Sequence, residues 1–344
     1  MIDWFFDDYI QKLIISFTNP QKRVSIGYIG TAILIALFWS VCLQGAKWRC
    51  GISNTIQKLF SRNILLSLSA KADYQIMLIN HGFLLLAAPF LISKVAFTTY
   101  LFFLLHELFP SGSAFLSPLP ILIVSILYTI FLFLLDDFSK YFTHSMMHRI
   151  PCLWSFHKVH HSAEVLTPIT VFRTHPIEGF IFVLRNAITQ GAVIGMFYFI
   201  SNGNIDLVTV LGANIFSFCF HLFGSNLRHS HINICYWRWL EHFLISPAQH
   251  QIHHSVKKIH HDKNFGVTFA FWDLIFGSLV FSKINQQIKY GLSKKENYIK
   301  HNIFQIYIFP IRESLSILFV IFKKNIIRFC NFFYISVFKY KRDF

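Results

Sequence analysis

Long apolar stretches are the feature that most constrains this chain, because a membrane-crossing helix needs roughly 17–25 mostly apolar residues. Four segments meet this requirement: Ile26–Leu43, Leu119–Leu135, Phe180–Ile200 and Ile205–Phe223. Two weaker segments, Ile76–Ile92 and Val95–Phe109, are short or contain polar residues, so we expect a pair that need not cross fully. The sequence therefore predicts an all-α integral membrane protein with about four to six transmembrane or re-entrant helices.

The composition agrees with this class. Hydrophobic residues make up 54% of the 344 residues and charged residues 14%, whereas a soluble domain carries about 25% charged residues. Disorder is excluded, since it requires low hydrophobicity and high net charge. The six cysteines contain no CxxC pair, which excludes a small disulfide scaffold.

The net charge of +15 is unevenly distributed along the chain. It concentrates in two loops, Asp136–Gly179 and Gly224–His301, and in the tail Leu315–Phe344. The positive-inside rule places both loops on the cytoplasmic side. We expect the tail to be an interfacial helix on anionic headgroups, with one further crossing as the alternative. This distribution predicts that the positive charge faces the cytosol and that the protein has no nucleic-acid partner.

We divide the chain into three parts: N-terminal membrane helices over 1–118, a central domain over 119–280 and a basic amphipathic tail over 281–344.

The 18 histidines are the sharper signal, and eight of them fall in three short runs within the basic loops. The runs are HxxxH (His144, His148), HxxHH (His157, His160, His161) and a second HxxHH (His250, His253, His254). At this histidine frequency one HxxHH pattern is expected about 0.05 times by chance. Spacings of three and four residues place side chains on one helix face, so each run presents its imidazoles together.

Imidazole suits zinc, copper, iron and nickel ions. Eight histidines exceed the coordination of one ion, so the runs predict a centre with two metals. Asp137 shares the helical stripe of the first run, and Ser246 with Pro247 predicts a helix that starts just before the third. A non-catalytic metal sensor or metal transporter is the alternative to an enzyme.

At these residues the chain resembles the fatty acid hydroxylase superfamily, also called the sterol desaturase family. Flanking matches extend the three histidine motifs over 119–277: Arg173–Glu178, Gly224–His231, Ser246–His250, Asp262–Gly266 and Phe271–Gly277. The resemblance, closest to bacterial members, implies a bacterial cell-membrane protein whose cytosolic His-rich helical cap holds two irons. It further implies use of O2 to hydroxylate or desaturate a C–H bond of a membrane lipid.

The resemblance also implies the site residues. The eight run histidines are expected metal ligands, and four further histidines are candidates: His221, His229, His231 and His175. Ligating imidazoles usually donate their other N–H to a carboxylate or carbonyl. Candidates for such support are Asp137, Asp262, Glu178, Asn226, Asn264 and Asp273. No separate acid or base is assigned, and zinc is a possible non-native occupant.

The expected partners are a membrane lipid and a separate ferredoxin- or cytochrome-type electron donor. Aminolipid, fatty-acyl, sterol, carotenoid and ether-lipid substrates all stay open, as do the choice between hydroxylation and desaturation and the oligomeric state.

Overall fold

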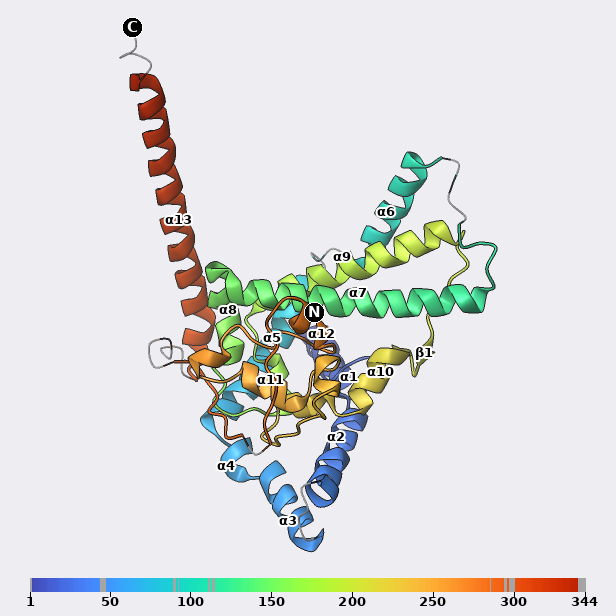
Figure 1. Ribbon diagram of the computed structural model, residues 1–344, viewed down its shortest axis with the longest axis vertical. Helices are drawn as coiled ribbons and strands as arrows, with labels where there is room; N and C mark the ends of the chain where they lie inside the picture. The colour runs from blue at the N-terminus through green and yellow to red at the C-terminus, as the bar shows by residue number, and fades with distance from the viewer. Residues whose placement is uncertain are drawn as a thin grey trace.

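The computed structural model describes residues 2–43, 48–88, 91, 93–110, 112, 115–284, 286–293, 296 and 301–339. Outside these residues lie the C-terminal part of the predicted segment Ile76–Ile92, except Leu91, three of the loop lysines (Lys294, Lys295, Lys300) and the end of the tail, 340–344. The described chain is built almost entirely of helices (Figure 1), which confirms the predicted fold class. The N-terminal helices are α1 (Ile2–Thr18), α2 (Ile26–Phe38), α3 (Trp48–Leu59), α4 (Arg62–Leu65), α5 (Leu68–Ala87) and α6 (Lys94–Leu108), with the π-turn η1 (Trp39–Leu43) after α2. The remaining helices are α7 (Ile121–Arg149), α8 (Pro151–His161), α9 (Pro176–Ile200), α10 (Ile215–Leu222), α11 (Pro247–His253), α12 (Phe271–Ile275) and α13 (Ile303–Lys339). Short 3-10 turns lie between them: η3 (Pro168–Phe172), η4 (Ser225–His229), η5 (Leu240–His242) and η6 (Lys258–His260).

Three described helices are long and apolar enough to cross a membrane: Ile121–Arg149, Pro176–Ile200 and Ile303–Arg328. The first two contain the predicted spans Leu119–Leu135 and Phe180–Ile200 almost completely. The predicted span Ile26–Leu43 is a shorter apolar helix that ends at Cys42.

Two long helices, α7 and α9, lie side by side, and α6 packs lengthwise on α9 (Figure 1). Two glycines on α9 permit the close approach of α6. A Cβ at Gly191 would lie 2.9 Å from Cδ1 of Phe97, and one at Gly195 would lie 3.3 Å from Cδ2 of Leu101. Small residues four apart are a common device for packing helices in membranes.

The predicted span Ile205–Phe223 is wrong as a continuous helix. It consists of a loop, the two-residue strands β1 (Thr209–Val210) and β2 (Ala213–Asn214), and α10. Leu211 and Gly212 turn the hairpin with positive φ angles of 50° and 75°, a conformation that interrupts a helix. The loop backbone is stabilised by α7, since Ser125 and Thr129 accept hydrogen bonds from the amides of Asp206 and Val208.

The C-terminal tail also differs from the interfacial helix that we expected. Its helix α13 starts twelve residues earlier, at Ile303, and its first 26 residues are apolar enough to cross a membrane, which favours the alternative of one further crossing. The base of α13 belongs to the cap: Ile306 packs with Ala72, Ile76 and Val159 in one buried cluster.

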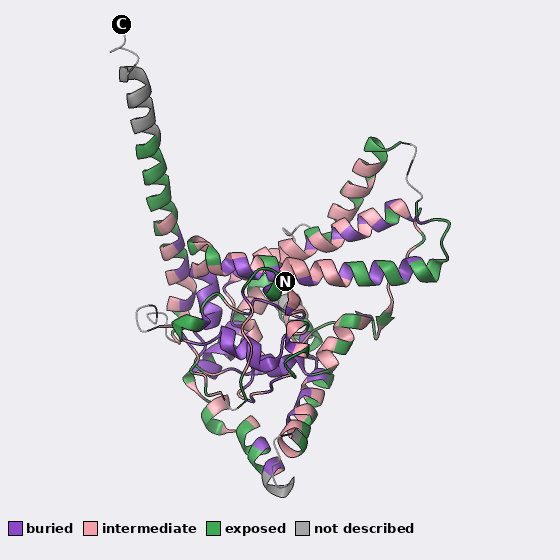
Figure 2. Cartoon of the chain, in the orientation of Figure 1, coloured by how far each residue is buried: buried purple, intermediate pink, exposed green. Residues whose placement is uncertain are grey.

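The buried residues concentrate where α8, α11 and the 3-10 turns meet, at the cap end of α7 (Figure 2). An ion pair between Asp73 and Arg173, with Oδ1 and Nη1 2.8 Å apart and both side chains fully buried, joins α5 to this cap. The Arg173 Nε donates to the carbonyl oxygen of Val159 on α8 at 3.0 Å. This network fixes the segment between α8 and α9 against α5 and α8.

Candidate metal centre

Nine histidines converge in the cap as two adjoining groups. In each group the potential ligand atoms lie within 4.8 Å of one another. The first group contains His144, His148, His157, His161 and His253, and the second contains His160, His229, His250 and His254. All eight histidines of the three sequence runs are included, and His229 joins them from η4.

Helical spacing explains how single runs serve both groups. On α8, His157 and His161 are four residues apart and face the first group, whereas His160 faces the second. At α11 the pair four apart is His250 and His254, which faces the second group. Residues four apart share a helix face, whereas adjacent residues such as His160 and His161 are about 100° apart around the helix axis and face different groups. The two groups therefore share α8 and the α11 segment as common walls.

The start of α11 is set by its own sequence. Ser246 caps the helix by accepting a hydrogen bond from the amide of Gln249 at 3.1 Å. The Gln249 side chain accepts in return from the Ser246 amide at 2.9 Å, and Pro247 occupies the first helical position. This reciprocal capping box fixes the first turn from which the third histidine run projects.

Several imidazole nitrogens face each other at short range. The Nε2 atoms of His144 and His157 are 3.1 Å apart, and that of His250 lies 3.0 Å from Nε2 of His229 and 3.3 Å from Nε2 of His254. Nitrogens bound to one metal at about 2.0–2.1 Å lie roughly 3.0–3.4 Å apart. The spacing between these nitrogens thus matches the edges of a coordination shell.

In three histidines the ring nitrogen that points away from the group donates a hydrogen bond to a backbone carbonyl, and this bond orients the ring. Nδ1 of His144 donates to the carbonyl oxygen of Phe265 at 2.8 Å, and Nδ1 of His253 donates to that of Lys263 at 2.8 Å. Nδ1 of His160 donates to the Arg173 carbonyl at 3.3 Å. With the proton on Nδ1, each ring presents a lone pair on Nε2 to its group, as metal-bound histidines do.

Glu178 orients a fourth ring, that of His157, through its carboxylate. It lies in the first turn of α9, is buried, and its Oε1 is 2.8 Å from Nδ1 of His157. Its Oε2 has no hydrogen-bond partner among the described residues. Of the other candidates for support, Asp262 lies 3.6 Å from Nδ1 of His148 but is 59% exposed.

Burial favours the neutral form of the clustered imidazoles. Loss of hydration, reinforced by neighbouring histidines, holds the pKa of His160, His161 and His254 well below the usual value. It lowers the pKa of His253 to about 3. Neutral imidazole is the form that binds metal, so these histidines need no deprotonation at neutral pH.

The residues present fit a pair of metal ions. Buried Nε2 atoms of His148, His161 and His253 have no hydrogen-bond partner among the described residues, and a buried polar atom without a partner calls for an explanation such as an ion. A donor set made of imidazoles alone suits iron, zinc, copper or nickel. His229 fits with a condition: Arg23 donates to its Nδ1 at 3.1 Å, so binding through Nε2 would require the ring to release a proton.

Three predicted ligand candidates lie outside the two groups. Nδ1 of His175 caps α9 by accepting from the Ile177 amide at 3.2 Å, and its Nε2 donates to the Tyr307 carbonyl at 3.1 Å. Nδ1 of His221 lies 2.9 Å from Oγ of Ser225. His231 lines a separate small cavity under α2.

The remaining polar candidates act on the loop that follows α11. Asp273 accepts from the amides of Phe265 and Gly266 at 2.8 and 2.7 Å, which positions the carbonyl that receives His144. Asp137 accepts from the amide of Thr268 at 2.9 Å.

Two asparagines join backbone segments around the centre. The side-chain amide of Asn264 donates to the carbonyls of Gln249 and Val280, and that of Asn226 donates to the carbonyl of Arg23.

Sequence reasoning missed Arg23 and the supporting carbonyls of Lys263 and Phe265. No motif marks a backbone carbonyl, because any residue provides one, and Arg23 lies about two hundred positions from its partner His229.

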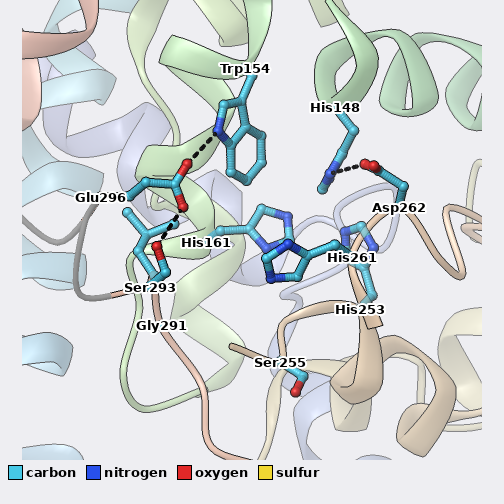
Figure 3. Close-up of a pocket in the computed structure, with 11 residues that line it drawn as sticks. His148, Trp154, His161, His253, Ser255, His261, Asp262, Gly291, Ser293 and Glu296 are labelled. Carbon is cyan, nitrogen blue, oxygen red and sulfur yellow. Dashed lines mark hydrogen bonds and ion pairs between the residues drawn. The ribbon is translucent and has the colours of Figure 1, made fainter. Parts of the chain in front are cut away.

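A polar cavity of about 180 Å³ opens onto the first group. Figure 3 shows His148, His161 and His253 at its wall, with Trp154 beside His148 and above the other two. The Trp154 ring lies 5.0 Å from that of His148 and 5.4 Å from that of His161, and its Nε1 donates to Glu296 at 3.3 Å. Trp154 therefore covers the first group on this side.

Comparison with known proteins assigns this region. Residues 129–278 match the family model for fatty acid hydroxylase, a segment that contains all nine clustered histidines. This part of the chain is similar to fatty acid hydroxylase domains. The resemblance that the histidine motifs predicted is thereby confirmed.

Curated relatives support the same superfamily. The alkylglycerol monooxygenase of Homo sapiens is 26% identical over 192 residues, which cover 51% of this chain and 36% of that protein. That of Xenopus tropicalis is 26% identical over 176 residues, 48% of this chain and 33% of the relative. A delta(7)-sterol 5(6)-desaturase of Aspergillus fumigatus is 27% identical over 170 residues, 46% of this chain and 48% of the relative. The chain thus aligns with about a third of the length of the alkylglycerol monooxygenases. No solved structure matches it.

Proposed function

We propose that this protein is a membrane-bound di-iron oxygenase that hydroxylates or desaturates a C–H bond of a membrane lipid. The observation that carries the proposal is the pair of buried imidazole groups inside the region that is similar to fatty acid hydroxylase domains. The curated relatives support it, since their names describe monooxygenases and desaturases of ether lipids and sterols.

Two irons bound here would supply O2 reduction, with two electrons delivered by a separate ferredoxin- or cytochrome-type protein. The chain's own contribution is to hold the imidazoles neutral and oriented. Nδ1–H bonds to carbonyls and to Glu178 fix the rings of His144, His157 and His253. Burial of both groups limits water around the reacting carbon, and water exclusion of this kind prevents side reactions.

The lipid is expected to enter from the bilayer side, where α7, α9 and α13 are apolar. We keep aminolipid, fatty-acyl, sterol, carotenoid and ether-lipid substrates as the range to be tested. In this proposal the His-rich cap faces the cytoplasm of a bacterial cell, as the basic loops predict.

The test compares two histidine variants that differ in whether they belong to the centre. His253→Gln removes a ligand of the first group. His261→Gln changes an exposed histidine eight residues away, which lines the polar cavity but lies outside both groups. We expect wild type and His261→Gln to hold about two irons per chain and His253→Gln to hold fewer. Metal analysis of the purified proteins measures this directly.

Lipid analysis of cells expressing each variant then tests the activity. We expect lipids that have gained one oxygen or lost two hydrogens with wild type and His261→Gln, and their absence with His253→Gln. Metal loss in His253→Gln without any change in lipids would contradict the enzyme proposal and favour a non-catalytic metal-binding protein. If the purified protein contains zinc, and replacing that zinc with iron restores the lipid product, zinc is a non-native occupant.

A further inference from the structure

An apolar cavity of about 530 Å³ lies beside the second histidine group and outside both metal groups. It is enclosed by the end of α1, the turn between α1 and α2, α5, η3 and the start of α9. Its volume falls within the range of about 300–1,000 Å³ that is typical of small-molecule sites. Met77, Phe83, Leu84, Phe180 and Val183 contribute to its apolar wall.

One side of this cavity is open. Phe83, Leu84 and Phe180 are each about half exposed, at 49%, 50% and 48%. All three lie on α5 or α9, and α9 is one of the helices long enough to cross a membrane. An apolar slot whose open side lies along such a helix suits a hydrocarbon chain.

The other end of the cavity is cationic. Lys22 and Arg23 line it, and none of the described lining residues is acidic. Neither cation forms an ion pair with a described carboxylate. Arg23 connects this end to the metal centre, because its Nη2 lies 3.1 Å from Nδ1 of His229.

A second guanidinium adds to the positive charge. Arg23 Nη2 and Arg228 Nε both donate to the carbonyl oxygen of Ser225, at 3.0 and 3.1 Å. Arg228 is buried, and its Nη1 donates to the Val267 carbonyl. Two guanidinium groups converge on one carbonyl oxygen, next to histidines that would hold cationic metals. Asp137 compensates part of the charge of Arg228, which lies outside the cavity lining. No described carboxylate lines the cavity beside Lys22 and Arg23, and positive charge in an apolar site favours an anionic ligand.

The positive charge continues past the cationic end of the cavity. Lys22 also lines an adjoining polar cavity of about 540 Å³, together with Lys94, Lys140 and Asp136. Asp136 is its one acidic described residue, and that carboxylate is already paired with Lys140 at 2.6 Å. Lys22 and Lys94 therefore give the adjoining cavity a net positive charge.

We propose that this cavity binds an anionic amphiphile, a fatty acid or a lipid phosphate, with its hydrocarbon chain between α5 and α9 and its anionic head at Lys22 and Arg23. The inference rests on the proposed function and sharpens it. The head end of the cavity lies nearest the second histidine group, which Arg23 contacts through His229.

Displacement of a fluorescent fatty acid from the purified full-length protein in detergent tests the proposal. The competitors are palmitate, hexadecyl phosphate and hexadecanol, which share one chain and differ in the head. We expect both anions to bind about tenfold or more tightly than hexadecanol, the worth of one charge-assisted hydrogen bond. The stronger of the two anions identifies the head, carboxylate or phosphate. Equal affinity for hexadecanol would overturn the proposal.

Variants locate the site. Lys22→Gln should reduce the preference for anions several-fold without weakening hexadecanol, and Lys22→Gln combined with Arg23→Gln should abolish it. Lys12→Gln is the matched control, since Lys12 lies on α1 outside the cavity and pairs with Asp8. Should the double variant fail to fold, the head-group series and Lys22→Gln still decide. An unchanged preference in Lys22→Gln would place the anion elsewhere and refute the assignment.

Substitutions at two glycines test where the hydrocarbon chain of the ligand lies. Gly179 lines the cavity, and a Cβ added there meets no atom within 4 Å, so Gly179→Leu should fill the space without a clash. Gly82 has equally open space but does not line the cavity. We expect Gly179→Leu to weaken all three competitors at least tenfold and Gly82→Leu to weaken none. Retained binding in Gly179→Leu would refute the chain position.

Binding is measured without turnover, so the two proposals fail separately. A protein that prefers the anions but oxidises no lipid would contradict only the oxygenase proposal. A protein that oxidises lipid but binds hexadecanol as tightly as palmitate would contradict only this inference.

Discussion

Replacing Glu178 by glutamine should weaken metal binding at the first histidine group and leave the second group intact. The Glu178 carboxylate is buried, and its Oε1 lies 2.8 Å from Nδ1 of His157, which belongs to the first group. Glutamine keeps the size and an acceptor oxygen. It removes the negative charge that raises the basicity of the ring and that balances a bound cation.

The expected magnitude follows from the position of this carboxylate behind a single ligand. Loss of such an outer partner lowers metal affinity by about 10–100-fold, which corresponds to roughly 1.4–2.8 kcal/mol. His157 is one of five histidines in its group, whereas Glu178 contacts none of the second group through a described hydrogen bond. One of two ions should therefore become labile.

The assay is competition with a chelator, followed by metal analysis of the recovered protein. Glu178→Gln should lose one ion at a chelator concentration that wild type withstands. Glu107→Gln is the matched control, because Glu107 is exposed on α6 and far from the centre in sequence. Thermal unfolding of both variants separates metal loss from misfolding. If Glu178→Gln retains both ions as firmly as Glu107→Gln, the assigned role of this carboxylate is refuted.

Three further outcomes are expected. Asp73→Ala removes the fully buried carboxylate that pairs with Arg173 and should lower the free energy of unfolding by about 3–5 kcal/mol, measured by thermal unfolding in detergent. Metal-free protein should lose stability as pH falls below about 6.5, since histidines such as His160 and His254 have lowered pKa values in the fold and bind protons mainly when unfolded. Each such histidine should lower the free energy of unfolding by about 1.4 kcal/mol per pH unit. A free energy of unfolding that does not fall with pH in acid would contradict the neutrality of these histidines. Gly191→Val adds bulk where even a Cβ meets a side chain at 2.9 Å and should destabilise the contact of α6 with α9, seen as a lower unfolding temperature than in Gly82→Val.

Local pattern was sufficient for much of the architecture. The span over Leu119–Leu135 and the histidines that follow form one helix, α7, as apolar length and spacing predicted. The prediction failed at Ile205–Phe223, because apolar content does not reveal that Leu211 and Gly212 adopt positive φ or that Ser125 and Thr129 satisfy the loop backbone. An apolar loop can have the same composition as an apolar helix, because a neighbouring helix can supply the hydrogen bonds that the loop backbone needs.

Spacing along the chain was enough to predict a helical membrane protein and to single out eight histidines that lie together in the fold. The division of the runs into two groups, the addition of His229 and the capping role of His175 depend instead on contacts between distant segments. Tertiary packing also brings Arg23 to His229 and places beside them an apolar cavity with a cationic end. These contacts join residues as far as two hundred positions apart, and such pairings arise from packing between elements rather than from any local pattern.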